Sequence, residues 1–124
     1  MQLIIDQLSK TYPNGVQALK NVSLTIGQGM FGLLGPNGAG KSSLMRTIAT
    51  LQEADSGSIS LDGMDVLKEK DAVRRILGYL PQDFGLYPRM PADQMLNHIA
   101  ALKGVASSAE RKEIVSALLH RVNL

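Results

Sequence analysis

Apolar and polar residues alternate in two stretches near the start of the chain, and a period of two is typical of strands. Residues 1–8 contain Leu3 and Ile5, and residues 22–26 repeat the alternation. A Pro-Asn-Gly turn at residues 13–15 separates the two stretches. The pattern therefore predicts two antiparallel strands, each with one face buried and one face exposed.

Three later stretches also predict strands. Residues 58–61 alternate in the same way as the first two stretches. Residues 30–34 and 76–80 are instead almost continuously apolar, and the second of these runs ends at Pro81. Continuous apolar runs of this length are typical of strands covered on both faces, so both runs are predicted to be buried strands.

Apolar residues three or four positions apart predict three helices, over residues 43–51, over residues 91–103 and from Ser107 to the end of the chain. The last helix has the capping-box pattern at its start, because Glu110 follows Ser107 by three positions. The stripes predicted to be buried are Leu44, Ile48 and Leu51 in the first helix, Met95, Ile99 and Leu102 in the second, and Ile114, Leu118 and Val122 in the third. Residues 68–75 mix both signs of charge, which predicts a helix with a solvated face.

The composition excludes several classes of protein. The chain has 124 residues, 44% of them hydrophobic and 19% charged, which is typical of one globular domain. Its net charge of +2 is too small to indicate nucleic acid as a partner. It has no cysteine, which excludes disulfides and cysteine-based metal sites. The absence of a long apolar run and of a basic region at the start predicts a soluble, cytoplasmic chain.

The most specific motif is Gly35-Pro36-Asn37-Gly38-Ala39-Gly40-Lys41-Ser42, which fits the phosphate-loop pattern G-x-x-x-x-G-K-[ST]. It lies between the predicted strand at residues 30–34 and the predicted helix at residues 43–51, which is the context that the motif requires. A glycine turn before an ordinary helix is the alternative interpretation. The strand and helix on either side favour a phosphate loop.

Each residue type in the motif has a physical reason. Glycines accept positive φ and lack a Cβ, so the backbone can fold around phosphates. The N–H groups at the start of the helix lie at the positive end of its dipole and bind anions. Lys41 is predicted to reach the β- and γ-phosphates, and the Ser42 hydroxyl to bind Mg²⁺. Ser43 either donates to the α-phosphate or is simply part of the helix, and Asn37 is predicted to shape the loop.

Together with two flanking segments, this motif resembles the ATP-binding domain of ABC transporters. Thr11-Tyr12, followed by residues 18–24, is similar to the aromatic A-loop segment of that family. Residues 35–43 have the usual Walker A sequence of that family. Residues 77–82 resemble the approach to the Q-loop, and residues 84–88 continue in the same style. The resemblance runs along the whole chain.

The resemblance implies an α/β fold with a partial P-loop NTPase core of the RecA type, an N-terminal antiparallel β layer and the start of a helical subdomain. Residues 1–82 would form the β layer, the P-loop and the Q-loop strand, and residues 83–124 would begin the helical subdomain. The sequence lacks a Leu-Ser-Gly-Gly-Gln signature, a Walker B segment with its catalytic Glu, and the switch histidine. The chain is therefore expected to be the N-terminal part of such a domain and to be marginally stable or aggregation-prone alone.

The resemblance also implies ligands and partners. Tyr12 would stack on adenine, although a tyrosine beside this turn also fits plain hairpin packing. Gln82 would contact Mg²⁺ and the attacking water, although it also fits a capped strand end. Lys41 and Gln82 would thus be the catalytic residues of this segment, and Ser42 and Gln82 the metal-binding ones. The predicted nucleotide-binding residues are Tyr12, Gly35, Pro36, Asn37, Gly38, Ala39, Gly40, Lys41, Ser42 and Ser43.

The leading hypothesis for function is an ATP-binding subunit that powers an ABC transporter. It implies ATP and Mg²⁺ as cofactors, a membrane permease bound through the Q-loop region, a dimer of ATP-binding domains, and a place on the cytoplasmic face of the membrane. A soluble ABC ATPase of translation or DNA repair and a non-hydrolysing nucleotide-binding fragment are the alternatives. No inserted arm separates Gln82 from the predicted helix at Pro91, and this favours a transporter. The complete protein is expected to be an ATPase and this segment at best a weak binder of nucleotide.

Overall fold

A computed structural model describes residues 1–36, 38, 40–82 and 88–124 of the chain. The chain forms two compact units, Met1–Tyr79 and Leu80–Leu124. Every helix in these described ranges is too short or too polar to cross a membrane. The functional division expected between residues 82 and 83 stays a prediction.

The first unit is built on a four-stranded antiparallel sheet. Its strands are β1 (Leu3–Thr11), β2 (Gln17–Ile26), β3 (Ser56–Leu61) and β4 (Met64–Asp65), in the order β2-β1-β3-β4. In the middle of the sheet, Ile5 of β1 pairs with Leu24 of β2 and with Ile59 of β3. The predicted turn closes the first hairpin, where the Tyr12 amide donates to the Val16 carbonyl at 2.9 Å. The three strands predicted from alternation are confirmed.

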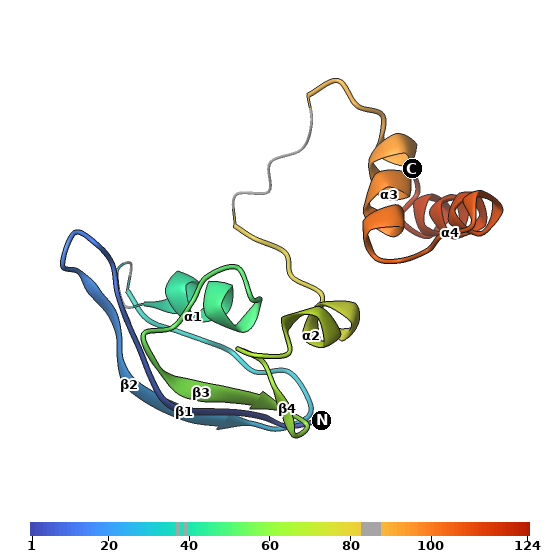
Figure 1. Cartoon of the computed structure of the whole chain (residues 1–124). Coiled ribbons are helices and arrows are strands. Elements are labelled where there is room, and N and C mark those ends of the chain that lie inside the picture. Colours follow the sequence, from blue (N-terminus) through green and yellow to red (C-terminus); the bar gives the residue numbers. More distant parts are fainter. Residues whose placement is uncertain (37, 39, 83–87) are drawn as a thin grey trace. The chain divides into compact units, whose positions relative to one another are not determined.

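The core of the first unit lies between the sheet and two helices. α1 (Lys41–Ile48) and α2 (Lys70–Ile76) cover the same face of the sheet (Figure 1). The buried core residues are Ile5, Leu8, Leu19, Leu44, Ile59, Leu61, Val66 and Val73. Of the stripe predicted for the first helix, Leu44 is buried and Ile48 half-buried, but Leu51 is 63% exposed. Leu51 is exposed because α1 ends at Ile48, before the predicted end.

The prediction of a buried strand over residues 30–34 is wrong. These residues belong to no strand, and Met30 and Leu34 are almost fully exposed. A strand needs a neighbour about 4.8 Å away to pair its backbone groups. Within the described residues, the sheet ends at β2 on one side and β4 on the other, and no strand runs beside residues 30–34. The apolar run therefore gains neither ladder partners nor a covering layer.

The prediction of a buried strand over residues 76–80 is also wrong. This run consists of the last residue of a helix followed by irregular chain. α2 ends at Ile76, which is 54% exposed, and Leu80 is 80% exposed. The mixed-charge stretch before it does form a helix, and an ion pair at i and i+3 joins Asp71 and Arg74 on its surface at 3.7 Å. The helix takes only the first residue of the run, and the residues after Ile76 belong to no strand within the described part of the chain.

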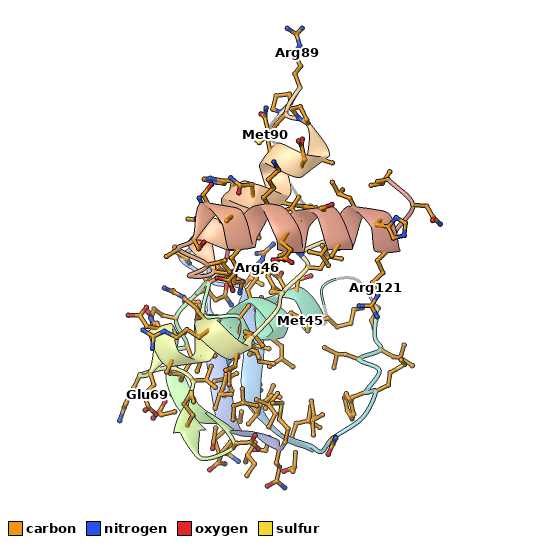
Figure 2. The ribbon with its side chains drawn as sticks, turned by 90° about the vertical axis from the view of Figure 1, so that its right-hand side faces the viewer. Met45, Arg46, Glu69, Arg89, Met90 and Arg121 are labelled. Carbon is orange, nitrogen blue, oxygen red and sulfur yellow. The ribbon has the colours of Figure 1, made fainter. Side chains whose placement is uncertain are left out.

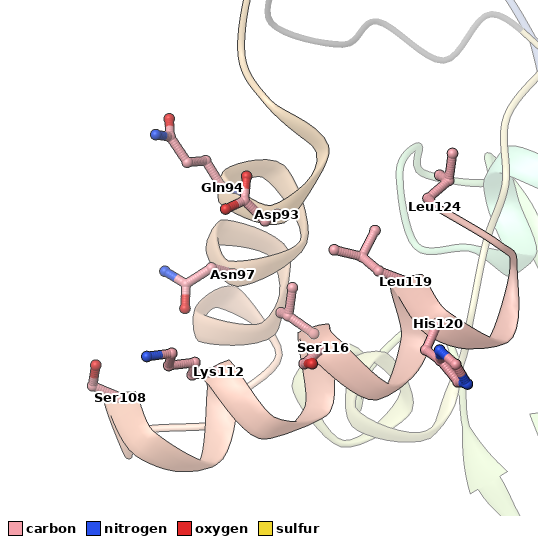
Figure 3. Close-up of a pocket in the computed structure, with 10 residues that line it drawn as sticks. Asp93, Gln94, Asn97, Ser108, Lys112, Ser116, Leu119, His120 and Leu124 are labelled. Atoms are coloured by element: carbon pink, nitrogen blue, oxygen red, sulfur yellow. The ribbon is translucent and has the colours of Figure 1, made fainter.

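The second unit consists of two packed helices, α3 (Ala92–Leu102) and α4 (Ser108–Arg121). The predicted capping residue is confirmed, since the Ser107 hydroxyl accepts from the Glu110 amide at 3.3 Å. Ahead of α3, the Arg89 side chain points away from both helices (Figure 2). Among the described residues of this unit, Val115 on α4 is the one buried residue.

The buried stripe of α4 is one position away from the predicted one. Val115 is 5% exposed, whereas the predicted residues Ile114, Leu118 and Val122 are 37%, 44% and 62% exposed. The rotation of the helix is set by Arg111, whose guanidinium donates to Asn97 on α3 at 3.1 Å and to the Val105 carbonyl at 2.8 Å. In α3, the predicted Met95 and Ile99 are half-buried, but Leu102 is exposed at the helix end.

Candidate phosphate-binding site

The phosphate loop leads directly into α1, and Gly40 makes the junction. Gly40 precedes the first residue of α1 and has a φ of +90°, in the left-handed region. A Cβ at this position would lie 2.2 Å from the carbonyl oxygen of Ala18 in β2. The glycine is therefore required twice, by its backbone conformation and by the close approach of β2. This approach fixes where the start of α1 lies relative to the sheet.

The first turn of α1 offers backbone donors. In the first intrahelical hydrogen bond the Leu44 amide donates to the Gly40 carbonyl at 2.9 Å, so the amides of Lys41, Ser42 and Ser43 precede it. Such amides have no intrahelical acceptor and lie at the positive end of the helix dipole. No acidic residue lies in the first turn. The start of α1 is therefore a positively polarised surface that suits an anion.

The Lys41 side chain folds over the loop that precedes the helix. Its ammonium group donates to the Gly35 carbonyl and, at 3.0 Å, to the Pro36 carbonyl. A lysine amine carries three donors on a flexible stem. Lys41 thus adds a positive charge beside the amides of α1, and these residue types in this geometry fit a phosphate chain. Gly38 has the positive φ that the loop needs, and Asn37 and Ala39 lie outside the described residues.

The predicted base-stacking residue, Tyr12, is joined to α1 by its hydroxyl group. The Tyr12 oxygen lies 2.6 Å from the Ser43 Oγ and 3.0 Å from the Gln52 Oε1. The amide nitrogen of Gln52 donates to the Ser43 carbonyl at 3.0 Å and to the Thr47 hydroxyl at 2.9 Å. The structure thus brings Tyr12 and Ser43 together, as parts of one hydrogen-bond network with Gln52.

The direction of each hydrogen bond in this network follows from the donors available. The Gln52 nitrogen already faces two acceptors, so its oxygen accepts the single proton of the Tyr12 phenol. The proton in the 2.6 Å contact therefore comes from Ser43. This hydrogen bond from Ser43 is the main reason that the pKa of Tyr12 is lowered from its ordinary value.

Gln52 reaches this network because the chain reverses after α1. Thr50 has a φ of +64°, and the Leu51 amide donates back to the Arg46 carbonyl at 2.9 Å, which is the six-to-one bond of a Schellman turn. The turn carries Gln52 back alongside α1. Sequence reasoning missed Gln52, since it belongs to no motif and only the turn brings it to Ser43.

The two residues predicted to bind a metal, Ser42 and Gln82, belong to different units of the chain. Ser42 is exposed in the first turn of α1, where its hydroxyl offers an oxygen of the kind that Mg²⁺ prefers. Gln82 belongs to the second unit and is exposed there. The stretch 84–88 that resembles the Q-loop continuation falls outside the described residues except for Pro88. A joint role of Ser42 and Gln82 at a metal ion stays a prediction.

The sheet, the phosphate loop and the helix that follows it define an α/β protein of the P-loop NTPase class. Residues 19–124 match the family described as ABC transporter, and the chain belongs to this family. The resemblance and the fold class inferred from the sequence are thus confirmed.

Relatives and solved structures agree with this assignment. The chain is 39% identical to the probable multidrug ABC transporter ATP-binding protein YbhF of Escherichia coli K12, over 98% of this chain and 21% of that protein. It is 44% identical to the sn-glycerol-3-phosphate import ATP-binding protein UgpC of Vibrio vulnificus YJ016, over 90% of this chain and 30% of that protein. The chain thus spans less than a third of the length of either relative.

A solved structure with the same fold is the ATP-binding cassette MJ0796, in a dimeric post-hydrolysis state bound to ADP and Pi. The TM-score is 0.81 and the sequence identity 28%, over 98% of this chain and 57% of that chain. The fold therefore extends over nearly all of this chain.

Proposed function

We propose that the chain binds the phosphates of ATP at the start of α1, as part of the nucleotide-binding subunit of an ABC transporter. The observation that carries the proposal is the placement of the Lys41 ammonium beside the backbone donors of α1. In this arrangement the ammonium group exchanges the Gly35 and Pro36 carbonyls for phosphate oxygens, and the amides of Lys41, Ser42 and Ser43 donate to the same phosphates. The membership of the chain in the ABC transporter family supports this assignment.

The other site residues take the roles that the resemblance to the family implies. Tyr12 provides the ring on which the adenine base stacks. Ser42 and Gln82 hold Mg²⁺, which neutralises part of the phosphate charge when it is bound. Ser43 contributes its backbone amide to the α-phosphate, because its hydroxyl proton is already donated to Tyr12.

The complete transporter subunit supplies what hydrolysis needs beyond these residues. Phosphoryl transfer requires a positioned water and neutralisation of charge on the transferred group. Lys41 and the α1 amides contribute to the neutralisation, and Gln82 orients the water. Two such subunits act together on the cytoplasmic face of the membrane, where the region around Gln82 contacts a permease. Relatives named as import and multidrug ATP-binding proteins support a role in transport.

Calorimetric titration of the 124-residue chain with Mg·ATP tests the binding proposal. Replacing Lys41 by Ala removes charge-assisted hydrogen bonds worth about 1.5–3 kcal/mol, so the Kd is expected to rise about tenfold to a hundredfold. Lys68→Ala is the matched control, since the Lys68 side chain is 84% exposed and lies between β4 and α2. Equal affinities in the unmodified chain and Lys41→Ala, with both folded by circular dichroism, would refute the proposal.

Titrations with and without Mg²⁺ test the metal role of Ser42. Ser42→Ala is expected to lose most of the gain in affinity that Mg²⁺ gives, while Ser42→Thr keeps the hydroxyl and therefore the gain. The chain alone is expected to bind ATP without turning it over. Phosphate release that disappears in Lys41→Ala would contradict that expectation.

A further inference from the structure

We propose that Gln52 is a positioning residue of the nucleotide site, which together with Ser43 holds the Tyr12 hydroxyl and so fixes the ring on which a base stacks. The inference rests on the proposed function and deepens it. Its basis is the hydrogen-bond network that joins the β1–β2 hairpin to the first turn of α1.

Gln52 contacts both ends of the site at once. Its oxygen accepts from the Tyr12 hydroxyl at 3.0 Å, and its nitrogen donates to the Ser43 carbonyl at 3.0 Å. Ser43 is 7% exposed, and its own amide is one of the three at the start of α1 that are proposed to donate to phosphates. The same glutamine therefore links the base-stacking residue to the phosphate-binding turn.

The network fixes the Tyr12 ring because it acts at the hydroxyl, the point farthest from the backbone. Tyr12 follows the last residue of β1, so the backbone alone leaves the ring able to rotate about its side-chain torsions. The Lys10 ammonium lies 5.9 Å from the centre of the ring, on one of its faces. With the hydroxyl held and one face next to a cation, a base would stack on the opposite face.

The structure also explains why Gln52 suits this position. Gln52 is half-buried, and its amide group supplies an acceptor toward Tyr12 and a donor toward Ser43 and Thr47. An amide offers an acceptor and two donors in one planar group. A carboxylate could accept from Tyr12 but could not donate to Ser43 and Thr47.

Separate titrations with Mg·ATP and with inorganic tripolyphosphate test this inference, because only ATP has a base. Gln52→Ala and Tyr12→Phe are each expected to raise the Kd for ATP about threefold to tenfold, and to leave the Kd for tripolyphosphate within about twofold. Tyr12→Phe keeps the ring and removes only the hydroxyl oxygen, so it tests the hydroxyl even if Gln52→Ala folds poorly. Gln28→Ala, an exposed glutamine of the same unit, is the control.

The double variant Gln52→Ala, Tyr12→Phe provides the sharpest readout. Both changes break the same hydrogen bond, so the double variant is expected to bind ATP as weakly as either single variant and no more weakly. If Gln52→Ala and Tyr12→Phe weakened the binding of ATP and of tripolyphosphate by the same factor, the role of the network would be merely structural and the proposal would be overturned. Unchanged affinity for ATP in these variants would overturn it too. If the unmodified chain bound neither ligand, the proposed function itself would fail.

Discussion

Gly40→Ala is the substitution that tests most sharply how the phosphate loop is held. The new Cβ would lie 2.2 Å from the Ala18 oxygen and 3.2 Å from a methyl group of Leu19. The Ala18 oxygen belongs to the backbone of β2 and cannot rotate away, so β2 or α1 must shift. An L-residue in the left-handed region costs about 1–2 kcal/mol, and relief of a core overlap costs about 1–3 kcal/mol more. Gly40→Ala is therefore expected to destabilise the first unit by about 2–5 kcal/mol.

Gly63→Ala separates the two contributions. Gly63 has a similar φ of +81°, but a Cβ there would meet nothing within 4 Å. Only the conformational cost of about 1–2 kcal/mol applies to it. Urea denaturation followed by circular dichroism gives the free energy of unfolding of each variant. Equal destabilisation by Gly40→Ala and Gly63→Ala would refute the claim that β2 positions the start of α1.

Three further predictions concern the rest of the molecule. Val115→Ala is expected to lower the protection of α4 amides from hydrogen exchange by about 1.5–3 kcal/mol, and Ile114→Ala by less than about 1 kcal/mol, since Val115 is buried and Ile114 is 37% exposed. A larger loss of protection in Ile114→Ala than in Val115→Ala would instead support the buried stripe predicted from the sequence. Ser107→Ala is expected to lower the protection of α4 amides by about 1 kcal/mol in the same measurement. Equal protection with and without the Ser107 hydroxyl would show that the cap does not stabilise α4. The Lys70 ammonium donates a hydrogen bond to Glu53 and lowers the pKa of that carboxyl, so this contact stabilises the fold above the ordinary pKa of Glu53 and is lost as the pH falls through the lowered value. Lys70→Met is expected to return the pKa of Glu53 to its ordinary value in an NMR titration. An unchanged pKa of Glu53 in this variant would contradict this cause.

Local patterns predicted the parts of the fold that local physics determines. The alternation in β1, β2 and β3 predicted one buried face each, and the capping residue of α4 was identified from two positions. Both signals depend only on neighbours within a few residues, so the sequence contains them in full. The phosphate loop is of the same kind, because its glycines and lysine are specified by the loop itself.

Features that depend on distant partners could not be predicted in this way. Residues 30–34 have the composition of a buried strand, but burial depends on a neighbouring strand that their own pattern does not encode. The rotation of α4 is set by the hydrogen bonds of Arg111 to α3 and the loop, which outweigh the apolar stripe. Gln52 enters the site only because Thr50 adopts a positive φ and reverses the chain.

The most direct test of the central claim is an NMR titration of the chain with Mg·ATP, read at each backbone amide. The largest saturable shifts are expected at Lys41, Ser42 and Ser43, because these amides are the proposed phosphate donors at the start of α1. Gln28, an exposed residue beyond β2, is expected to shift little and serves as an internal reference. Saturable shifts elsewhere in the first unit, with these three amides unchanged in a folded chain, would contradict the account.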